Sequence, residues 1–236
     1  MVMLSVVIPA YNESHRIERT MREVLAYLTT ADHAFELIVV DDGSTDSTAE
    51  LVLANSNPAV RLLRLPKNLG KGAAVRAGCL EARGDCILFM DADHSTRIEE
   101  VESFVPLLEQ GHDLVVGVRT YQDGESRSRR VMGLTFLIFA HLFVFRKAVV
   151  DSQCGFKAFT RSAAQLIFSN CRNNGGTIDV EIFYLAHKFG LNIFFAPVHW
   201  RNAPGSTITI WKCILRDPFD MLLIRLRDLL NRYSKS

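Results

Sequence analysis

The sequence predicts an α/β fold in which a mostly parallel, Rossmann-like sheet is flanked by helices. Short apolar segments rich in β-branched residues alternate with segments whose apolar residues recur at helical spacing. Several of the apolar segments end in acidic residues, and open α/β sheets bind their ligands beyond the carboxyl ends of the strands. A hydrophobic content of 48% in 236 residues is ample for one core. We therefore expect one large domain with a C-terminal appendage.

The first two predicted strands lead into polar loops. A strand is predicted at residues 4–8, and a loop begins at Pro9 because proline cannot continue a central hydrogen-bond ladder. The helix that follows carries its apolar residues on one face: Ile17, Met21, Val24, Leu25 and Leu28. The second strand, at 35–40, ends in Asp41 and Asp42. A turn rich in serine, threonine and aspartate then caps a short helix.

The next two strands enclose a glycine-bearing loop. A strand at 60–65 is followed by Asn-Leu-Gly-Lys-Gly at 68–72, which opens a helix at 73–82, and a buried strand follows at 85–90. Strands that alternate with helices indicate right-handed βαβ units. The remaining predicted elements are a helix at 97–109, a strand at 113–118, an apolar helix at 131–150, a short extended piece after the turn at 151–157, a helix at 177–189, a strand at 191–198 and a helix from 211 onward.

The bulk properties exclude several classes of function. The net charge of +1 produces no global field that would attract nucleic acid, so we expect no nucleic-acid partner. The five cysteines show no Cys-x-x-Cys spacing, which argues against a zinc cluster or a disulfide framework and fits a reducing, cytosolic setting. The first ten residues have no basic start and only a short apolar segment, so we expect a strand there and not a signal peptide.

Polar residues at three places after predicted strands are candidates for binding a ligand. Asp91 and Asp93 follow a buried strand, and carboxylate oxygens are preferred ligands of hard divalent cations, although such a pair also suits a helix N-cap followed by a solvated acid. Asp41 accepts hydrogen bonds only, so it suits the imide N–H of uracil or the N1–H and N2–H of guanine. Lys71 lies between two glycines and suits a phosphate, but the sequence around it is not a Walker loop.

The order of these motifs resembles a known family. The motifs are Val-Ile-Pro-Ala-Tyr-Asn-Glu at 7–13, Val-Val-Asp-Asp-Gly-Ser-Thr-Asp at 39–46, Asn-Leu-Gly-Lys-Gly at 68–72, Met-Asp-Ala-Asp at 90–93, Gly-Val-Arg at 117–119, Asp-Ser-Gln-Cys-Gly-Phe-Lys at 151–157, Ile-Asp-Val-Glu at 178–181 and Ile-Arg-Leu-Arg at 224–227. Together they resemble the family 2 glycosyltransferases of the GT-A fold, and within them the polyprenyl-phosphate hexosyltransferases of the dolichyl-phosphate β-glucosyltransferase type. The match covers nearly the whole chain. Two departures are the missing N-terminal membrane helix of eukaryotic members and His94 after the acidic pair.

This resemblance implies an inverting transferase that moves a hexose from an α-linked nucleotide donor to a lipid phosphate. UDP-glucose is the expected donor, and GDP-mannose or another nucleotide sugar is the alternative. Asp91 and Asp93 are expected to bind Mg²⁺ or Mn²⁺, which neutralises the leaving diphosphate. The residues expected to bind the nucleotide sugar are Pro9, Tyr11, Glu13, Asp41, Lys71, Asp91 and Ala92.

An anionic acceptor calls for cations near the site. We expect Arg119 and Arg130 to bind the acceptor phosphate bidentately, with Lys157, Arg127 and Arg129 as further candidates. The alternative for this basic segment is a solvated loop. The expected catalytic residues are therefore Asp91, Asp93, Arg119, Arg130 and Asp179.

The role of Asp179 depends on the acceptor. The second pKa of a phosphate monoester is about 6, so such an acceptor is mostly a dianion at neutral pH and needs no general base. Asp179 is then expected to orient the acceptor or the sugar, and the alternative is a first-turn acid favoured by the helix dipole. Because Asp179 and Glu181 are two residues apart on a helix, only one of them can face the site, and we predict Asp179.

A lipid acceptor favours attachment to a membrane surface. The apolar run at 131–145 is shorter than the ~20 residues that a spanning helix needs. Basic residues flank this run and the apolar face of the C-terminal helix, as in helices that lie in a membrane interface, although core packing would explain both. We expect peripheral attachment to the cytoplasmic face of a membrane. The expected division is a catalytic domain at 1–205, with a donor half at 1–118 and an acceptor half at 119–205 that carries the amphipathic helix at about 131–148, and C-terminal interfacial helices at 206–236.

Three other functions fit parts of the sequence. A family 2 transferase acting on a saccharide hydroxyl would need a true base at Asp179. A sugar-nucleotide pyrophosphorylase would need a glycine-rich loop after the first strand, which is absent. A non-catalytic sugar-nucleotide or lipid-binding protein would tolerate a degenerate acidic pair, whereas Asp91 and Asp93 are both present.

Overall fold

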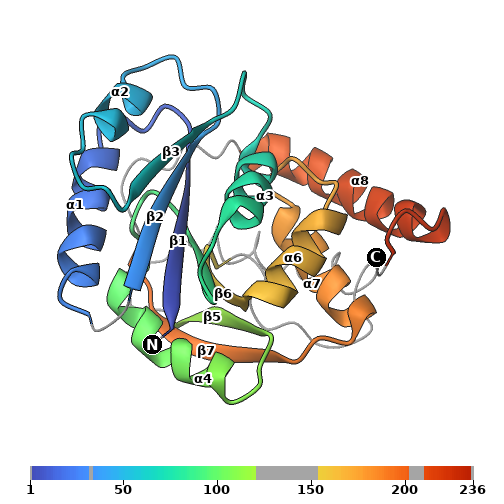
Figure 1. The fold of residues 1–236 in the computed structure, drawn as a ribbon. Coiled ribbons are helices and arrows are strands. Elements are labelled where there is room, and N and C mark those ends of the chain that lie inside the picture. Colours follow the sequence, from blue (N-terminus) through green and yellow to red (C-terminus); the bar gives the residue numbers. More distant parts are fainter. Residues whose placement is uncertain (1, 32–33, 121–153, 202–209, 235–236) are drawn as a thin grey trace.

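The computed structural model of the chain describes residues 2–31, 34–120, 154–201 and 210–234, and of residues 210–218 only the backbone (Figure 1). The described strands are β1 (Met3–Ala10), β2 (Ala34–Asp41), β3 (Val60–Arg64), β4 (Cys86–Met90), β5 (Leu114–Thr120), β6 (Phe156–Thr160) and β7 (Ile193–His199). The described helices are α1 (Ile17–Leu28), α2 (Thr48–Leu53), α3 (Lys71–Glu81), the 3₁₀ helix η1 (Ile98–Ser103), α4 (Val105–Glu109), α6 (Arg161–Asn170), α7 (Ile178–Phe189) and α8 (Ile210–Leu229).

The strands form one seven-stranded sheet in the order β3-β2-β1-β4-β6-β5-β7. Strand β1 pairs in parallel with β2 and β4, β2 pairs in parallel with β3, and β5 pairs in parallel with β7. Among the described strands, only β6 runs antiparallel to its neighbours, β4 and β5. The predicted α/β fold with a mostly parallel sheet is therefore confirmed.

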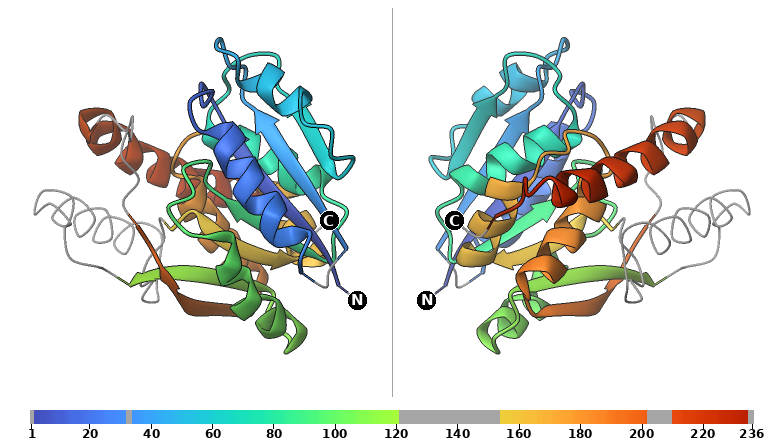
Figure 2. Two further views of the ribbon diagram at one scale, coloured as in Figure 1. Left: turned by 90° about the vertical axis from the view of Figure 1, so that its left-hand side faces the viewer. Right: turned by 90° about the vertical axis from the view of Figure 1, so that its right-hand side faces the viewer.

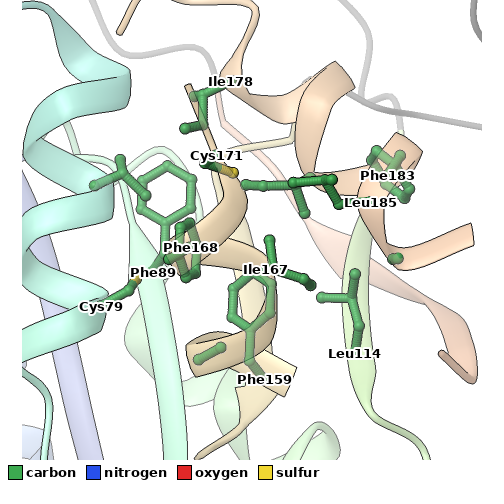
Figure 3. Close-up of a cluster of buried hydrophobic side chains, with 14 of the residues drawn as sticks. Cys79, Phe89, Leu114, Phe159, Ile167, Phe168, Cys171, Ile178, Phe183 and Leu185 are labelled. Atoms are coloured by element: carbon green, nitrogen blue, oxygen red, sulfur yellow. The ribbon is translucent and has the colours of Figure 1, made fainter. Parts of the chain in front are cut away.

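Helices cover both faces of this sheet, so the chain is built in three layers (Figure 1). Alternation along β1 places Val6 and Ile8 in the core beneath α1, α2, η1 and α4, and Val7 in the core beneath α3, α6, α7 and α8. Figure 3 shows part of the second core, where Cys79 of α3, Phe89 of β4 and Phe168 of α6 meet.

Most predicted elements are present, and α1 shows why. The five apolar residues predicted to share one face of this helix are all buried, and each buried aliphatic side chain of this size contributes about 1.5–3 kcal/mol. Helix α3 begins two residues earlier than predicted, so that Lys71 is its first residue. This places the Lys71 ammonium at the edge of the sheet where β1, β2 and β4 end.

The structure corrects two predictions and adds one element. Strand β1 continues through Pro9, because its pairing with β4 ends at Val7 while β2 still pairs with Pro9. The single helix predicted at 97–109 is a 3₁₀ turn followed by a short α-helix, with Pro106 in the first turn of the second piece. Helix α6 was not predicted, and Thr160 caps it by accepting a hydrogen bond from the Ala163 amide.

A buried carboxylate holds the amino-terminal ends of the central strands. Glu36 of β2 lies opposite Ser5 of β1 and is 5% exposed. It accepts hydrogen bonds from the Ser5 hydroxyl at 2.6 Å, the Arg83 amide at 2.6 Å and the Arg61 guanidinium at 2.7 Å. Burial alone would raise the pKa of Glu36, but these hydrogen bonds outweigh burial and lower the pKa below its usual value.

This network predicts a pH-dependent loss of stability in Glu36→Gln. A lowered folded-state pKa contributes stability above the unfolded value of about 4.3, and this contribution is lost as the pH falls through the folded value. At pH 7 we expect the substitution to lower the free energy of unfolding by about 1–3 kcal/mol. Urea denaturation between pH 7 and pH 3 should show the difference shrinking below pH 4.5. Glu18→Gln, on the exposed side of α1, is the matched control, and a deficit independent of pH would contradict the prediction.

Candidate active site

Three neighbouring parallel strands end at one edge of the sheet. Ala10, the last residue of β1, pairs with Asp41, the last residue of β2. Strand β4 lies on the other side of β1 and ends at Met90, directly before Asp91. The acidic loops predicted separately from the sequence are therefore adjacent in space.

The loops after β1 and β2 are joined by hydrogen bonds. The Asn12 amide donates to the Ser44 hydroxyl at 2.9 Å, and the Asn12 carboxamide oxygen accepts from the Thr45 amide at 2.9 Å. Asn12 adopts a left-handed backbone conformation (φ 54°), which asparagine tolerates better than most residues. The Glu13 amide also donates to the Thr48 hydroxyl at 2.8 Å. The two loops therefore form one rigid rim, on which Tyr11 is 43% exposed.

Asp41 is buried at the base of this rim with part of its hydrogen-bonding capacity unused. Its Oδ1 accepts from the Ser44 amide at 2.9 Å. Its Oδ2 forms an ion pair with Arg64 Nε at 3.1 Å, but no aligned hydrogen bond reaches this oxygen from the described residues. A buried carboxylate oxygen without an aligned hydrogen-bond donor suits an N–H donor of a nucleobase, and this role of Asp41 stays a prediction.

Asp42 organises the glycine-bearing loop through hydrogen bonds to its backbone. Its two carboxylate oxygens accept from the Leu69 amide and the Gly70 amide, each at 2.8 Å. Gly70 has φ +104°, and a Cβ on it would lie 2.2 Å from Asn174 O. A Cβ on Gly72 would lie 2.5 Å from Asn173 O. Both glycines are therefore required because the loop at 173–175 packs directly against them.

This close packing sets the position of Lys71. The Lys71 ammonium lies 2.7 Å from Asp91 Oδ1. Burial would lower the pKa of Lys71, but the charges of Asp91, Asp179 and Asp93 outweigh burial and raise it, so the side chain stays protonated. Gly155 makes room for Asp91 on the other side, because a Cβ there would lie 1.9 Å from Asp91 Oδ2. The glycine of the Gln-Cys-Gly-Phe-Lys motif thus leaves room for the side chain of Asp91.

Helix α1 supports the loop that carries the acidic pair. Thr20 donates its buried hydroxyl to Ala92 O at 2.8 Å. His94 has φ 53°, and its Nδ1 lies 2.5 Å from the carboxylate of Glu23. Asp93 Oδ1 accepts from the Ser95 amide at 2.9 Å, and no hydrogen bond from the described residues reaches its other carboxylate oxygen. The contacts of Thr20 and Glu23 attach the Asp-Ala-Asp loop to α1.

The two carboxylates fit a divalent cation only in part. Asp91 and Asp93 offer carboxylate oxygens at one loop. Burial raises the pKa of nearby Glu13 despite the opposing charge of Arg16, and the charge of Asp93 adds a smaller contribution in the same direction. In the described part of the chain no group of three or more histidine, cysteine or acidic residues could hold a metal ion. The donor set therefore suits a cation, such as Mg²⁺ or Mn²⁺, that completes its coordination with phosphate oxygens of a substrate.

Asp179 lies beside this site in a buried ion pair. Its Oδ1 lies 2.6 Å from the Lys157 ammonium, and the two side chains are 5% and 0% exposed. Lys157 also donates to Cys154 O and lies 5.8 Å from the centre of the Phe89 ring. In this conformation Lys157 is the partner of Asp179, so its predicted contact with an acceptor phosphate stays a prediction.

The other acid of this motif points away from the site. Glu181 is fully buried and accepts from the Arg172 and Asn173 amides at 2.8 Å and 2.7 Å. Its other oxygen accepts from the Tyr233 hydroxyl at 2.6 Å. Asp179 and Glu181 thus face different partners, as their spacing predicted.

Arg119 reaches the same edge of the sheet from β5. Its guanidinium carbon lies 5.5 Å from the centre of the Trp200 ring, which is a cation–π distance. Trp200 in turn pairs with Thr96, and the Arg201 amide donates to Ser95 O at 2.8 Å, so the end of β7 is tied to the loop after Asp93. Arg130, Arg127, Arg129 and the predicted helix at 131–148 lie outside the described residues.

Helix α8 presents an apolar stripe to solvent. The exposed residues are Phe219, Leu222, Leu226, Leu229 and Leu230. On its inner side Met221 and Ile224 are buried, and Asp228 is bonded to Tyr184 and Lys188 of α7. Figure 2 shows α8 along the outside of the layer that contains α6 and α7. None of the helices described here combines the length and the apolar character needed to cross a bilayer.

Sequence reasoning missed several residues that shape the site. Asn173 and Asn174 hold the glycine-bearing loop, Thr20 and Glu23 hold the acidic loop, and Gly155 gives Asp91 its space. The Asn-Asn-Gly-Gly sequence at 173–176 was a detectable turn signal. The sequence did not indicate the contacts of Thr20 and Glu23, because its pattern around these residues predicts only an amphipathic helix.

The chain is similar to a described family over most of its length. Residues 5–168 match the family model described as Glycosyl transferase family 2. A dolichyl-phosphate beta-glucosyltransferase of Trichomonas vaginalis is 38% identical over 229 residues, which cover 89% of this chain and 67% of the relative. The enzyme of the same name from Homo sapiens is 38% identical over 249 residues, covering 96% of this chain and 76% of the relative.

The fold is also similar to that of a solved enzyme. The crystal structure of glucosyl-3-phosphoglycerate synthase from Mycobacterium tuberculosis in complex with Mn²⁺, UDP-glucose and phosphoglyceric acid superposes with a TM-score of 0.72 at 25% sequence identity. The match covers 95% of this chain and 79% of that chain. The predicted GT-A fold is confirmed by this likeness.

The buried pair of Lys157 and Asp179 predicts a strong stability effect. Lys157→Met would leave the Asp179 carboxylate buried without its counter-ion, so we expect the free energy of unfolding to fall by about 3–5 kcal/mol. The double variant Lys157→Met/Asp179→Leu should recover much of this loss. Chemical denaturation measures both, and Lys71→Met, which breaks a pair that is about one third exposed, should cost at most about 1 kcal/mol. Equal losses for Lys157→Met and Lys71→Met would contradict this account.

Proposed function

Because the chain belongs to glycosyltransferase family 2, we propose that it transfers glucose from UDP-glucose to a polyprenyl phosphate and forms a β-linked lipid-phosphate sugar. The observation that carries this proposal is the shared edge of β1, β2 and β4, where Asp41, Lys71 and Asp91 converge. The dolichyl-phosphate beta-glucosyltransferases to which the chain is similar support the choice of glucose and of a lipid phosphate.

The donor would lie along this edge with each part of the nucleotide sugar on a different loop. Asp41 Oδ2 would accept the imide N–H of uracil, with Pro9 and Tyr11 on the rim beside the base. Lys71 would neutralise the diphosphate, and Glu13 and Ala92 would line the same loops. Asp91 and Asp93 would hold the divalent cation, which stabilises the negative charge that develops on the leaving diphosphate.

The acceptor in this proposal supplies its own nucleophile. A lipid monophosphate is mostly a dianion at neutral pH, since its second pKa is about 6. Asp179 already holds the buried Lys157 ammonium through Oδ1, and this pairing favours a role in orienting the substrates over a role as a base. Arg119, held on Trp200 beside the loop after Asp93, is the described arginine best placed to bind the acceptor phosphate. Arg130 remains the proposed second member of this clamp.

A lipid acceptor requires that the enzyme work at a bilayer surface. The exposed stripe on α8 is the described surface that suits such contact, and Arg232 beside it is exposed as well. A helix of this kind lies in the interface with its apolar face among the acyl chains and its basic residues near anionic headgroups. We propose that α8 attaches the enzyme peripherally to the cytoplasmic face of a membrane.

A transfer assay tests the proposed activity. The protein is incubated with a short polyprenyl phosphate, Mn²⁺ or Mg²⁺ and a panel of UDP- and GDP-sugars, and the lipid products are identified by mass. We expect glucosyl lipid from UDP-glucose and about a hundredfold or greater loss of rate in Asp93→Ala, which removes a carboxylate from the cation. A product from GDP-mannose alone, or transfer to a saccharide hydroxyl in place of the lipid, would replace the proposal with the corresponding alternative.

Vesicle sedimentation tests the role of α8. Leu222→Glu/Leu226→Glu places two charges on the exposed stripe, so binding to vesicles of phosphatidylcholine and phosphatidylglycerol should weaken by about tenfold or more. The matched control is Leu53→Glu on α2, where the leucine is 69% exposed on the opposite layer. Binding of UDP should be the same in all three proteins. Unchanged vesicle binding in the α8 variant would remove this helix from the membrane contact.

A further inference from the structure

The Lys71 ammonium contacts Asp91, one of the two aspartates that we propose as ligands of the divalent cation. It is 2.7 Å from Asp91 Oδ1, while Asp91 Oδ2 faces Gly155 so closely that no Cβ fits between them. The same Cβ would lie 2.8 Å from Asp91 Oδ1, which is the oxygen that the Lys71 ammonium already contacts. A divalent cation that binds Asp91 through this oxygen has to displace Lys71 or share the oxygen with a repelling charge.

The two lysine–aspartate pairs of the site differ in exposure, and therefore in how readily each lysine can leave its aspartate for another anion. Lys157 and Asp179 are 0% and 5% exposed, and Lys157 is also bonded to Cys154 O. Lys71 and Asp91 are 34% and 35% exposed. A buried pair cannot separate without leaving a charge unpaired, whereas a partly exposed pair can exchange its partner for a solvated ion. The first pair is built as a fixed element and the second as an exchangeable one.

The backbone around Lys71 keeps the ammonium in reach of a second anion. Gly70 and Gly72 are locked against Asn173 and Asn174, and the Gly72 amide donates to Asn174 O at 2.9 Å. Lys71 is also the first residue of α3, where amide groups without helical partners favour anions. A long, flexible lysine side chain on a fixed backbone can turn from a carboxylate to a phosphate nearby.

The described residues by themselves offer the cation too few ligands. No group of three or more candidate ligand residues occurs in the described ranges, so tight binding requires oxygens from the donor. The donor diphosphate supplies both these oxygens and a new negative charge for Lys71.

We propose that Lys71 is an exchangeable counter-ion that occupies Asp91 until the nucleotide donor arrives and then moves to the donor diphosphate as the divalent cation takes its place. The inference rests on the proposed function in that it takes the donor to be a nucleoside diphosphate sugar. Lys71 thereby opposes binding of the metal alone and favours binding of metal and nucleotide together. Metal and nucleotide binding are positively coupled, and the coupling acts equally in both directions.

Titration calorimetry with Mn²⁺ and with UDP tests this exchange without any measurement of transfer. In Lys71→Met we expect Mn²⁺ alone to bind about tenfold more tightly than in the wild type, and UDP at saturating Mn²⁺ to bind about tenfold more weakly. Each tenfold change corresponds to about 1.4 kcal/mol. These opposite shifts are diagnostic, because damage to the loop would weaken both ligands.

Two control variants and one double-mutant cycle complete the experiment. Lys71→Arg keeps the charge and should stay close to the wild type for Mn²⁺ alone, while Lys67→Met removes an exposed charge from the same loop and should change neither affinity. In an Asp91→Asn background, Lys71→Met should no longer tighten Mn²⁺ binding, since the contested oxygen has lost its charge.

The outcomes separate this inference from the proposed function. Equal or weaker Mn²⁺ binding in Lys71→Met, with UDP and Mn²⁺ still binding the wild type together, would overturn the exchange and leave the proposed function standing. If the wild type binds no UDP with Mn²⁺ present, the proposed function itself fails, and the exchange fails with it.

Discussion

The backbone contact between the loops at 68–72 and 173–175 is the constraint on which the rest of the site depends. Gly70 and Gly72 approach Asn173 and Asn174 so closely that no Cβ fits at either glycine. This contact joins the loop that follows β3 to the loop that precedes α7, which are a hundred residues apart in the sequence but adjacent in the fold. Lys71 lies on one side of the contact and Asp179 on the other. The contact thereby joins the first and second halves of the chain at this edge of the sheet.

The charges at this edge are arranged so that carboxylates outnumber the lysines that neutralise them. Lys71 pairs with Asp91, and Lys157 pairs with Asp179. The hydrogen bond from the Ser95 amide uses only one of the two carboxylate oxygens of Asp93. An excess of negative charge attracts a cation, and the lysines keep the fold stable before one binds. The unequal exposure of the two pairs gives them different tasks: one fixes α7 to β6, and the other remains open to exchange.

Local patterns predicted the strands, the face of α1 and the acidic strand ends, because each depends on neighbours within a few residues. The path of β1 through Pro9 was not predictable, since it depends on where the pairing with β4 stops. The pair of Lys157 and Asp179 was missed for a similar reason, because a contact between a strand and a helix has no periodicity in the sequence. The motif order identified the family and predicted the residues of the candidate site, whereas the residues that support this site could be found only from the packing.

Helix α7 connects the chemistry to the surface that we assign to the membrane. Asp179 points from its first turn toward Lys157 and Lys71, and Glu181, two residues later, points toward Tyr233 at the end of the chain. Thr177, just before the helix, accepts from Asn173 and donates to Asp220 of α8. The loop that locks Gly70 and Gly72 is thus bonded, through one residue, to the helix that carries the exposed apolar stripe. In the proposed function, a bilayer that bound α8 would therefore contact a helix that is bonded, through Thr177, to the loop packed on Gly70 and Gly72.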